Sequence, residues 1–108
     1  MTTEAGHGYQ QAQLEDLAKR ICGHIQSEWA AFNTQVFYRL HTDKYIDVTV
    51  ISSLFEGQMG PEREGALWQL LAPFSPQELL HLTGCLLLTP SEAQRLAIER
   101  PTSTKGEL

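Results

Sequence analysis

Between Thr34 and Ile51 the chain reads TQVFYRLHTDKYIDVTVI. The first half of this stretch is rich in β-branched and aromatic residues, and the second half alternates apolar and polar side chains from Tyr45 onward. Such alternation is typical of a strand that buries one of its two faces. A short polar segment joins the two halves. The sequence therefore predicts an antiparallel hairpin with strands at residues 34–40 and 45–51.

A long helix is predicted before the hairpin. Apolar residues recur there at steps of three or four, which places them on one stripe of a helix. The stripe consists of Leu14, Leu17, Ala18, Ile21, Ile25, Trp29 and Phe32. We expect an amphipathic helix from about Gln10 to Ala31.

Three further helices and one strand are predicted after the hairpin. Pro61 suits the first turn of a helix, where its missing N–H would have had no partner. The segments Ser75–Glu78 and Thr89–Glu92 both read S/T-P-x-E, which is the pattern of a helix capping box. The Leu-rich run at 82–88 lies between them and is interpreted as a strand buried on both faces. The last helix is expected to end near Arg100, because a proline follows it.

The predicted order is helix, strand, strand, helix, short helix, strand, helix. This order indicates an α+β domain with a three-stranded mixed sheet and helices packed on one face. The domain is expected to span residues 9–100. Residues 1–8 are interpreted as a flexible tail, and residues 101–108 are expected to be disordered.

Composition narrows the classes of function. The chain has 108 residues, with 8 Lys and Arg against 13 Asp and Glu, for a net charge of −5. This balance disfavours broad binding to nucleic acid, although it permits a local basic patch. No apolar run approaches the length of a membrane span.

The two cysteines, Cys22 and Cys85, form neither a disulfide framework nor a CxxC pair, so a cytoplasmic location is expected. No phosphate-binding loop, nucleophile elbow or zinc-protease motif is present, so we do not expect an enzyme.

Two histidines are candidate metal ligands. His41 lies at the predicted hairpin turn and His81 lies directly before the last strand. Each alone is typical of a surface or capping histidine. Together they provide two imidazoles without a third ligand, which is half of a metal site that a partner with thiolates would complete. Imidazole and thiolate together are one known ligand set for a [2Fe–2S] cluster. Phe37 and Tyr38 offer aromatic rings for stacking on nucleic acid, or simply belong to the core and the sheet surface.

The residues after the hairpin resemble the BolA family. The family pattern F-x-G-x-[ST]-x-[VLI]-x-R is matched by Phe55, Gly57 and Arg63, with Leu67 and Trp68 at the apolar and aromatic positions that follow. The family's histidine before the last strand, with a T-P-x-E cap nine residues on, corresponds to His81 and Thr89–Glu92. The predicted element order is also similar to the family's αββααβα fold, a relative of the type II KH domain. The chain departs from the family at four positions. Met59 replaces the usual Ser or Thr, Pro61 replaces the usual aliphatic residue, Glu64 replaces the histidine that follows the arginine, and Leu82 replaces the alanine that usually follows the family histidine.

This resemblance implies a non-enzymatic adaptor in iron–sulfur or iron homeostasis. Its expected partner is a monothiol glutaredoxin, which would share a [2Fe–2S] cluster and glutathione with it, and no cofactor is expected in the isolated protein. His81 matches the family's ligand, and His41 lies in the loop that supplies the second one. Phe55, Gly57 and Arg63 are expected to bind the partner. The alternatives are a KH-like nucleic-acid-binding or transcriptional regulator and an interaction module without cluster ligation, and a homodimer is compatible with either.

Overall fold

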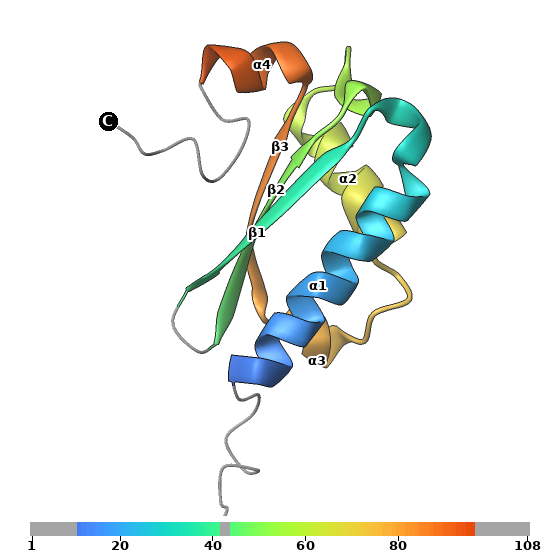
Figure 1. The fold of residues 1–108 in the computed structure, drawn as a ribbon. Helices are drawn as coiled ribbons and strands as arrows, with labels where there is room; N and C mark the ends of the chain where they lie inside the picture. The colour runs from blue at the N-terminus through green and yellow to red at the C-terminus, as the bar shows by residue number, and fades with distance from the viewer. Residues whose placement is uncertain (1–10, 42–43, 97–108) are drawn as a thin grey trace, which may run out of the picture.

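A computed structural model describes residues 11–41 and 44–96 of the chain (Figure 1). The predicted tails at 1–8 and 101–108 lie outside these residues. The observed order of helices and strands is the predicted one, with two additional 3-10 turns. The elements are α1 (Gln11–Glu28), a 3-10 turn (Ala30–Phe32), β1 (Gln35–His41), β2 (Tyr45–Ile51), a second 3-10 turn (Ser53–Phe55), α2 (Gly60–Leu70), α3 (Pro76–Leu79), β3 (Leu82–Leu88) and α4 (Pro90–Arg95).

The three strands form the predicted mixed sheet, with β2 in the middle (Figure 1). β1 and β2 are antiparallel, with Val36 opposite Val50. β2 and β3 are parallel, with Val48 opposite Cys85. A parallel neighbour requires a crossover connection, and the segment with α2 and α3 provides it. The first residues of β2 and β3 therefore lie at the same end of the sheet as the last residue of β1.

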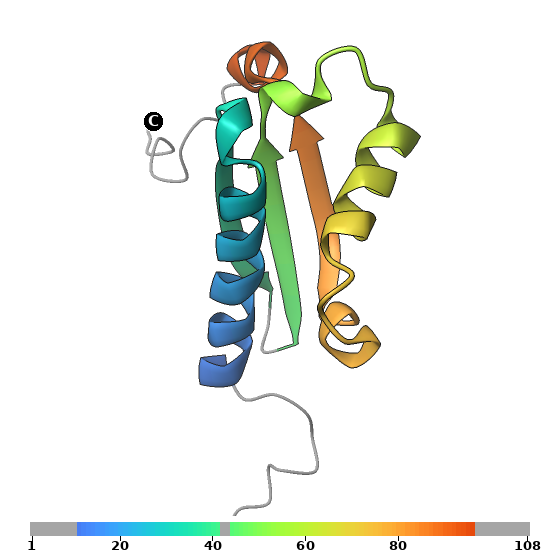
Figure 2. The same cartoon turned by 90° about the vertical axis from the view of Figure 1, so that its right-hand side faces the viewer.

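Helices α1 and α2 cover one face of the sheet, as seen in Figure 2. The stripe predicted for α1 forms much of the core together with the inward residues of β2, with one exception. The helix ends at Glu28 rather than near Ala31, and Phe32 lies in the 3-10 turn that follows, where it is 40% exposed. Burial of each aliphatic side chain of the core contributes roughly 1.5–3 kcal/mol. No helix among the described residues combines the length and the apolar character needed to cross a membrane. The buried core residues are Leu14, Leu17, Ala18, Ile21, Ile25, Trp29, Ile46, Val48, Val50, Phe55, Leu67, Leu71, Leu82 and Leu87.

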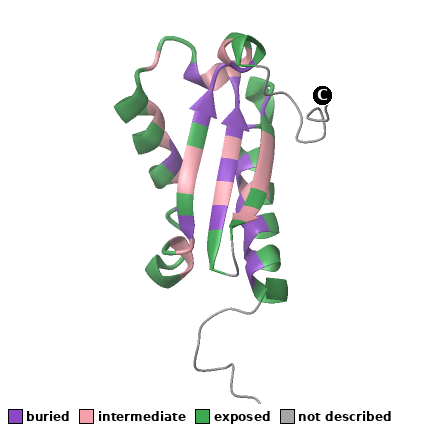
Figure 3. Ribbon diagram, turned by 90° about the vertical axis from the view of Figure 1, so that its left-hand side faces the viewer, coloured by how far each residue is buried: buried purple, intermediate pink, exposed green. Residues whose placement is uncertain are grey.

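Two local predictions need correction. β3 is not buried on both faces, because its second face is largely uncovered and Leu86 is 42% exposed there (Figure 3). Helix α4 covers only the far end of that second face, where Ala93 packs against Ile51 and Leu88. This helix ends at Arg95 rather than near Arg100, and the residue that follows it, Leu96, is exposed.

Both predicted capping boxes are present. The Ser75 hydroxyl accepts from the Glu78 N–H at 3.1 Å, and the Glu78 carboxylate accepts from the Ser75 N–H at 2.9 Å. Thr89 and Glu92 form the same reciprocal pair at 3.2 and 2.9 Å. These caps fix where β3 begins and ends, because α3 leads into the strand and α4 follows it directly.

Candidate functional site

The two candidate histidines lie at one end of the sheet, on either side of β2. His41 is the last residue of β1 and is opposite Tyr45, the first residue of β2. On the other side of β2, the N–H of Ile46 donates to the carbonyl of His81 at 2.7 Å. Neighbouring strands are about 4.8 Å apart, so the backbones that carry the two histidines are about 10 Å apart. Topology thus brings together two residues that are distant in sequence.

The His81 imidazole is held by the backbone of the residue before β2. Its Nδ1 lies 2.7 Å from the carbonyl oxygen of Lys44. A carbonyl oxygen can only accept, so Nδ1 carries the proton in this contact. In the neutral ring the electron pair is then on Nε2. This is the tautomer found in metal-ligating histidines whose other ring nitrogen donates to a backbone carbonyl.

The His41 imidazole contacts a carboxylate instead. Its Nε2 lies against Oδ2 of Asp47, which is the third residue of β2. Arg39 approaches the same oxygen at 4.0 Å. The His41 side chain is 50% exposed and that of Asp47 is 32% exposed, so the pair lies on the surface. We refer to His41, Lys44, Asp47, His81 and Gly84 as the histidine end of the sheet.

Thiolate ligands are not available from the chain itself. Both cysteines are free and pack against the core. Burial raises the pKa of the Cys22 thiol to about 12 and that of Cys85 to about 11. Among residues 11–41 and 44–96, no group of three or more His, Cys, Asp or Glu could hold a metal ion. In the described part of the chain, the histidine end therefore offers imidazole nitrogens and no thiolate to complete a cluster site.

The three residues predicted to bind a partner lie elsewhere, near the C-terminal ends of β2 and β3. Arg63, on α2, has a side chain that is only 13% exposed. Its guanidinium donates to the carbonyls of Gln58 at 3.0 Å and Leu87 at 2.9 Å, and to both carboxylate oxygens of Glu92 at 2.7 and 3.1 Å. These contacts join α2, β3 and α4. The guanidinium also helps to hold the pKa of Glu92 at about 2.

Phe55 and Gly57 belong to the same region. Phe55 has no exposed surface and packs edge-to-face on Trp29, with ring centroids 5.6 Å apart. Any role of Phe55 in partner binding would be indirect. Gly57 has a φ of +78°, which side chains disfavour, so its conformation explains the glycine. We refer to Phe55, Gly57, Arg63 and Glu92 as the arginine end.

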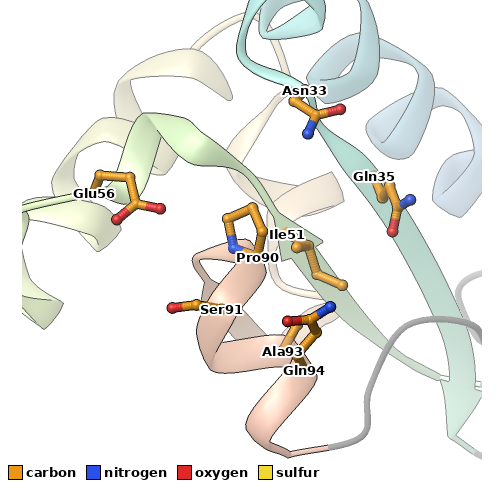
Figure 4. Close-up of a pocket in the computed structure, with 8 residues that line it drawn as sticks. All are labelled: Asn33, Gln35, Ile51, Glu56, Pro90, Ser91, Ala93 and Gln94. Atoms are coloured by element: carbon orange, nitrogen blue, oxygen red, sulfur yellow. The ribbon is translucent and has the colours of Figure 1, made fainter.

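The structure therefore separates the five predicted site residues into two groups. β3 extends from one group to the other. Its seven residues span six intervals of about 3.3 Å each, so the two groups are about 20 Å apart. A pocket of about 460 Å³ opens beside the arginine end, between the start of β1 and α4 (Figure 4). Three carboxamides and one carboxylate contribute to its lining, and none of the five predicted residues does. The lining residues are Asn33, Gln35, Ile51, Glu56, Pro90, Ser91, Ala93 and Gln94.

Comparison with known proteins supports the fold. No protein-family model and no curated protein sequence matches the chain. The solved structure of BolA1 from Arabidopsis thaliana superposes on it with a TM-score of 0.55 at 24% sequence identity, and the match covers 70% of this chain and 94% of that one. The domain has a BolA-like fold. This likeness agrees with the family that the sequence resembles, and it confirms the predicted α+β architecture.

Within this BolA-like fold, sequence reasoning missed the groups that hold the candidate residues. The Lys44 carbonyl contacts His81, the Asp47 carboxylate contacts His41, and the Glu92 carboxylate pairs with Arg63. Glu92 was recognised only as part of a cap. A signal was available for Asp47, because Gly84 inside a strand is typical of a bulge or of a close approach by another group.

Proposed function

We propose that the chain is a non-enzymatic BolA-like adaptor that binds a monothiol glutaredoxin through a shared [2Fe–2S] cluster. In this proposal the adaptor acts in iron–sulfur or iron homeostasis in the cytoplasm, and its two free cysteines suit a reducing compartment. The observation that carries the proposal is the backbone contact of His81, in which Nδ1 donates to the carbonyl of Lys44, so that Nε2 carries the electron pair when the ring is neutral. His41 at the same end of the sheet is the second candidate ligand.

The donor set at the histidine end fits half of such a cluster. His81 and His41 would supply imidazole nitrogens. The remaining ligands would be thiolates from the glutaredoxin cysteine and glutathione, since burial keeps Cys22 and Cys85 protonated at neutral pH. When bound, a cluster with mixed imidazole and thiolate ligands has a higher reduction potential than one with thiolates alone. An incomplete ligand set on this chain is what a bridging site between two proteins requires.

The surface around the histidines is compatible with a partner. The side chain of His41 is half exposed, and no helix covers the second face of the sheet beside it (Figure 3). Tyr45, the first residue of the central strand β2, is 43% exposed. Aromatic residues of this kind are enriched in protein interfaces. A glutaredoxin that approaches this end of the sheet would therefore meet an aromatic side chain beside the ligands.

The test is a titration of cluster-loaded monothiol glutaredoxin, with glutathione present, by the full chain. Visible circular dichroism follows the ligand environment of the cluster. We expect the spectrum to change and saturate with the wild-type chain, and to stay unchanged with His81→Ala. His7→Ala is the matched control, since it removes a histidine outside the described residues, and it should behave as the wild type. The proposal is overturned if the wild-type chain leaves the spectrum unchanged or if His81→Ala acts like the wild type.

A further inference from the structure

We propose that Asp47 is a positioning residue that fixes which ring nitrogen His41 presents, and that Gly84 makes this possible. The proposal rests on the proposed function, because it concerns how His41 would serve as a ligand. It is carried by two independent observations, the contact between Asp47 and His41 and the close approach of the Asp47 carboxylate to Gly84.

The carboxylate of Asp47 lies between the two outer strands of the sheet. Asp47 is on β2 and points to the face without α1 and α2, since its neighbours Ile46 and Val48 are buried in the core on the other face. On the β1 side its Oδ2 contacts Nε2 of His41, and Arg39 lies 4.0 Å from the same oxygen. These are the charged and titratable groups that the structure places against it from β1.

On the β3 side the carboxylate lies directly over Gly84. The pairing of β2 with β3 shifts register between Ile46 and Asp47, and this shift sets Asp47 opposite Gly84. A Cβ atom at position 84 would overlap Oδ1 of Asp47 and lie 3.2 Å from its Cγ. Any residue other than glycine would push the carboxylate away from this position. The absence of a side chain at position 84 therefore leaves room for Asp47 to reach His41.

The contact determines which nitrogen of the His41 ring acts as the donor. An ionised carboxylate only accepts, so the ring nitrogen against it carries the proton. With the proton on Nε2, the neutral ring has its electron pair on Nδ1. A carboxylate that orients a histidine in this way is a common outer-shell partner in metal sites. His81 has the opposite arrangement, because its Nδ1 donates to Lys44 and its electron pair is on Nε2. The two histidines would thus present different nitrogens.

The simpler interpretation is an exposed ion pair without function. Such pairs contribute little to stability and impose little order on their side chains. The two interpretations differ in how well the His41 ring is ordered. A positioning role predicts one dominant tautomer and one side-chain rotamer of His41 that depend on Asp47, whereas a surface ion pair predicts an averaged ring.

The first experiment uses nitrogen-15 NMR of the imidazole rings in the full chain without cluster, at alkaline pH. We expect the wild-type His41 ring to have well-separated nitrogen shifts with the proton on Nε2, and side-chain couplings of a single rotamer. In Asp47→Ala the shift separation should narrow and the couplings should average. Asp47→Asn keeps an acceptor oxygen and should restore most of the wild-type behaviour. Thr49→Ala, two residues along β2, is the matched control and should leave His41 unchanged.

The proposal is overturned if the wild-type ring carries its proton on Nδ1, or if Asp47→Ala changes neither the shifts nor the couplings. Backbone amide spectra of each variant establish that the fold is retained. Gly84→Ala provides a second route to the same answer, since it displaces the carboxylate while leaving it in the chain, and it should reproduce the Asp47→Ala spectrum of His41.

The second experiment separates this proposal from the proposed function. In the glutaredoxin titration, Asp47→Ala should weaken cluster binding by about tenfold or more, as loss of an outer-shell partner generally does. If the wild-type chain binds no cluster-loaded glutaredoxin, the proposed function fails while the tautomer result stands. If the wild type binds and Asp47→Ala binds equally well with an altered ring, the positioning role is overturned while the proposed function stands.

Discussion

The two ends of the sheet use polar residues in different ways. At the arginine end, the charged side chains of Arg63 and Glu92 are partly buried, and the arginine makes several hydrogen bonds. The Arg63 guanidinium has three partners, and nearby the wholly buried Ser52 hydroxyl bonds to Thr34 at 2.9 Å. At the histidine end, each imidazole has a polar contact near the surface. Buried, satisfied networks are costly to break, whereas exposed contacts contribute little to folding. The comparison indicates that the arginine end maintains the fold, whereas the histidine end, where we propose that the partner binds, contributes less to it.

The largest effect on stability is expected from removing the arginine. Arg63→Ala leaves Glu92 and the carbonyls of Gln58 and Leu87 without their donor, so the free energy of unfolding should fall by about 3 kcal/mol. Arg95→Ala, at the exposed end of α4, is the matched control and should change it by less than about 0.5 kcal/mol. Urea denaturation measures both. Equal effects of the two variants would remove the structural distinction between the ends.

Glycine substitutions are expected to have smaller effects of opposite sign. Gly57→Ala places a side chain at a φ of +78° and should destabilise the protein by about 1–2 kcal/mol. Gly23→Ala lies in the middle of α1, where a Cβ would meet nothing within 4 Å, and should stabilise it by about 0.5–1 kcal/mol. Thermal denaturation of the two variants against the wild type checks the signs. A stabilising Gly57→Ala would contradict the conformational role of that residue.

The pH dependence of stability should also reflect the arginine end. Arg63 and the Thr89 backbone hold the pKa of Glu92 at about 2, below its ordinary value of 4.5. The folded state therefore favours the charged carboxylate, and the resulting stability is complete above about pH 4.5. It should be lost as the pH falls from 4.5 through 2. Urea midpoints measured across this range should fall less steeply in Glu92→Gln. An identical slope in both proteins would argue against the depressed pKa.

The smallest effects on stability are expected at the histidine end. His41→Ala and His81→Ala remove contacts near the surface, so the free energy of unfolding should change by less than about 1 kcal/mol in each variant. Chemical denaturation without any partner measures this. A loss as large as that of Arg63→Ala would show that the histidines also serve the fold, and the contrast between the two ends would no longer hold.

Local patterns predicted the fold well because the determinants of its elements are close in sequence. The capping boxes at Ser75 and Thr89 need only three following residues, and the alternation in β2 is complete within the strand. β3 was misread because Leu86 is apolar yet lies on a part of the second face that no described helix covers. Its exposure depends on where α4 packs, which no short pattern specifies.

The candidate site was predictable only in part. The sequence and its family resemblance singled out His41 and His81, but their proximity depends on strand order. The groups that hold the site residues come from distant positions, as with Arg63 and Glu92. The contact of Asp47 with Gly84 depends on a register shift between parallel strands. Such contacts are consequences of topology, and a single sequence carries little direct information about them.

The most direct test of glutaredoxin binding at the histidine end is an NMR experiment that maps which backbone amides of this chain the partner perturbs. Cluster-loaded monothiol glutaredoxin is added to the nitrogen-15-labelled full chain, and the perturbed backbone signals are mapped. Signals from His41, Tyr45 and His81 are expected to shift or broaden first and most strongly. Perturbation confined to Gly57 and Arg63, with the histidine end unchanged, would contradict this expectation.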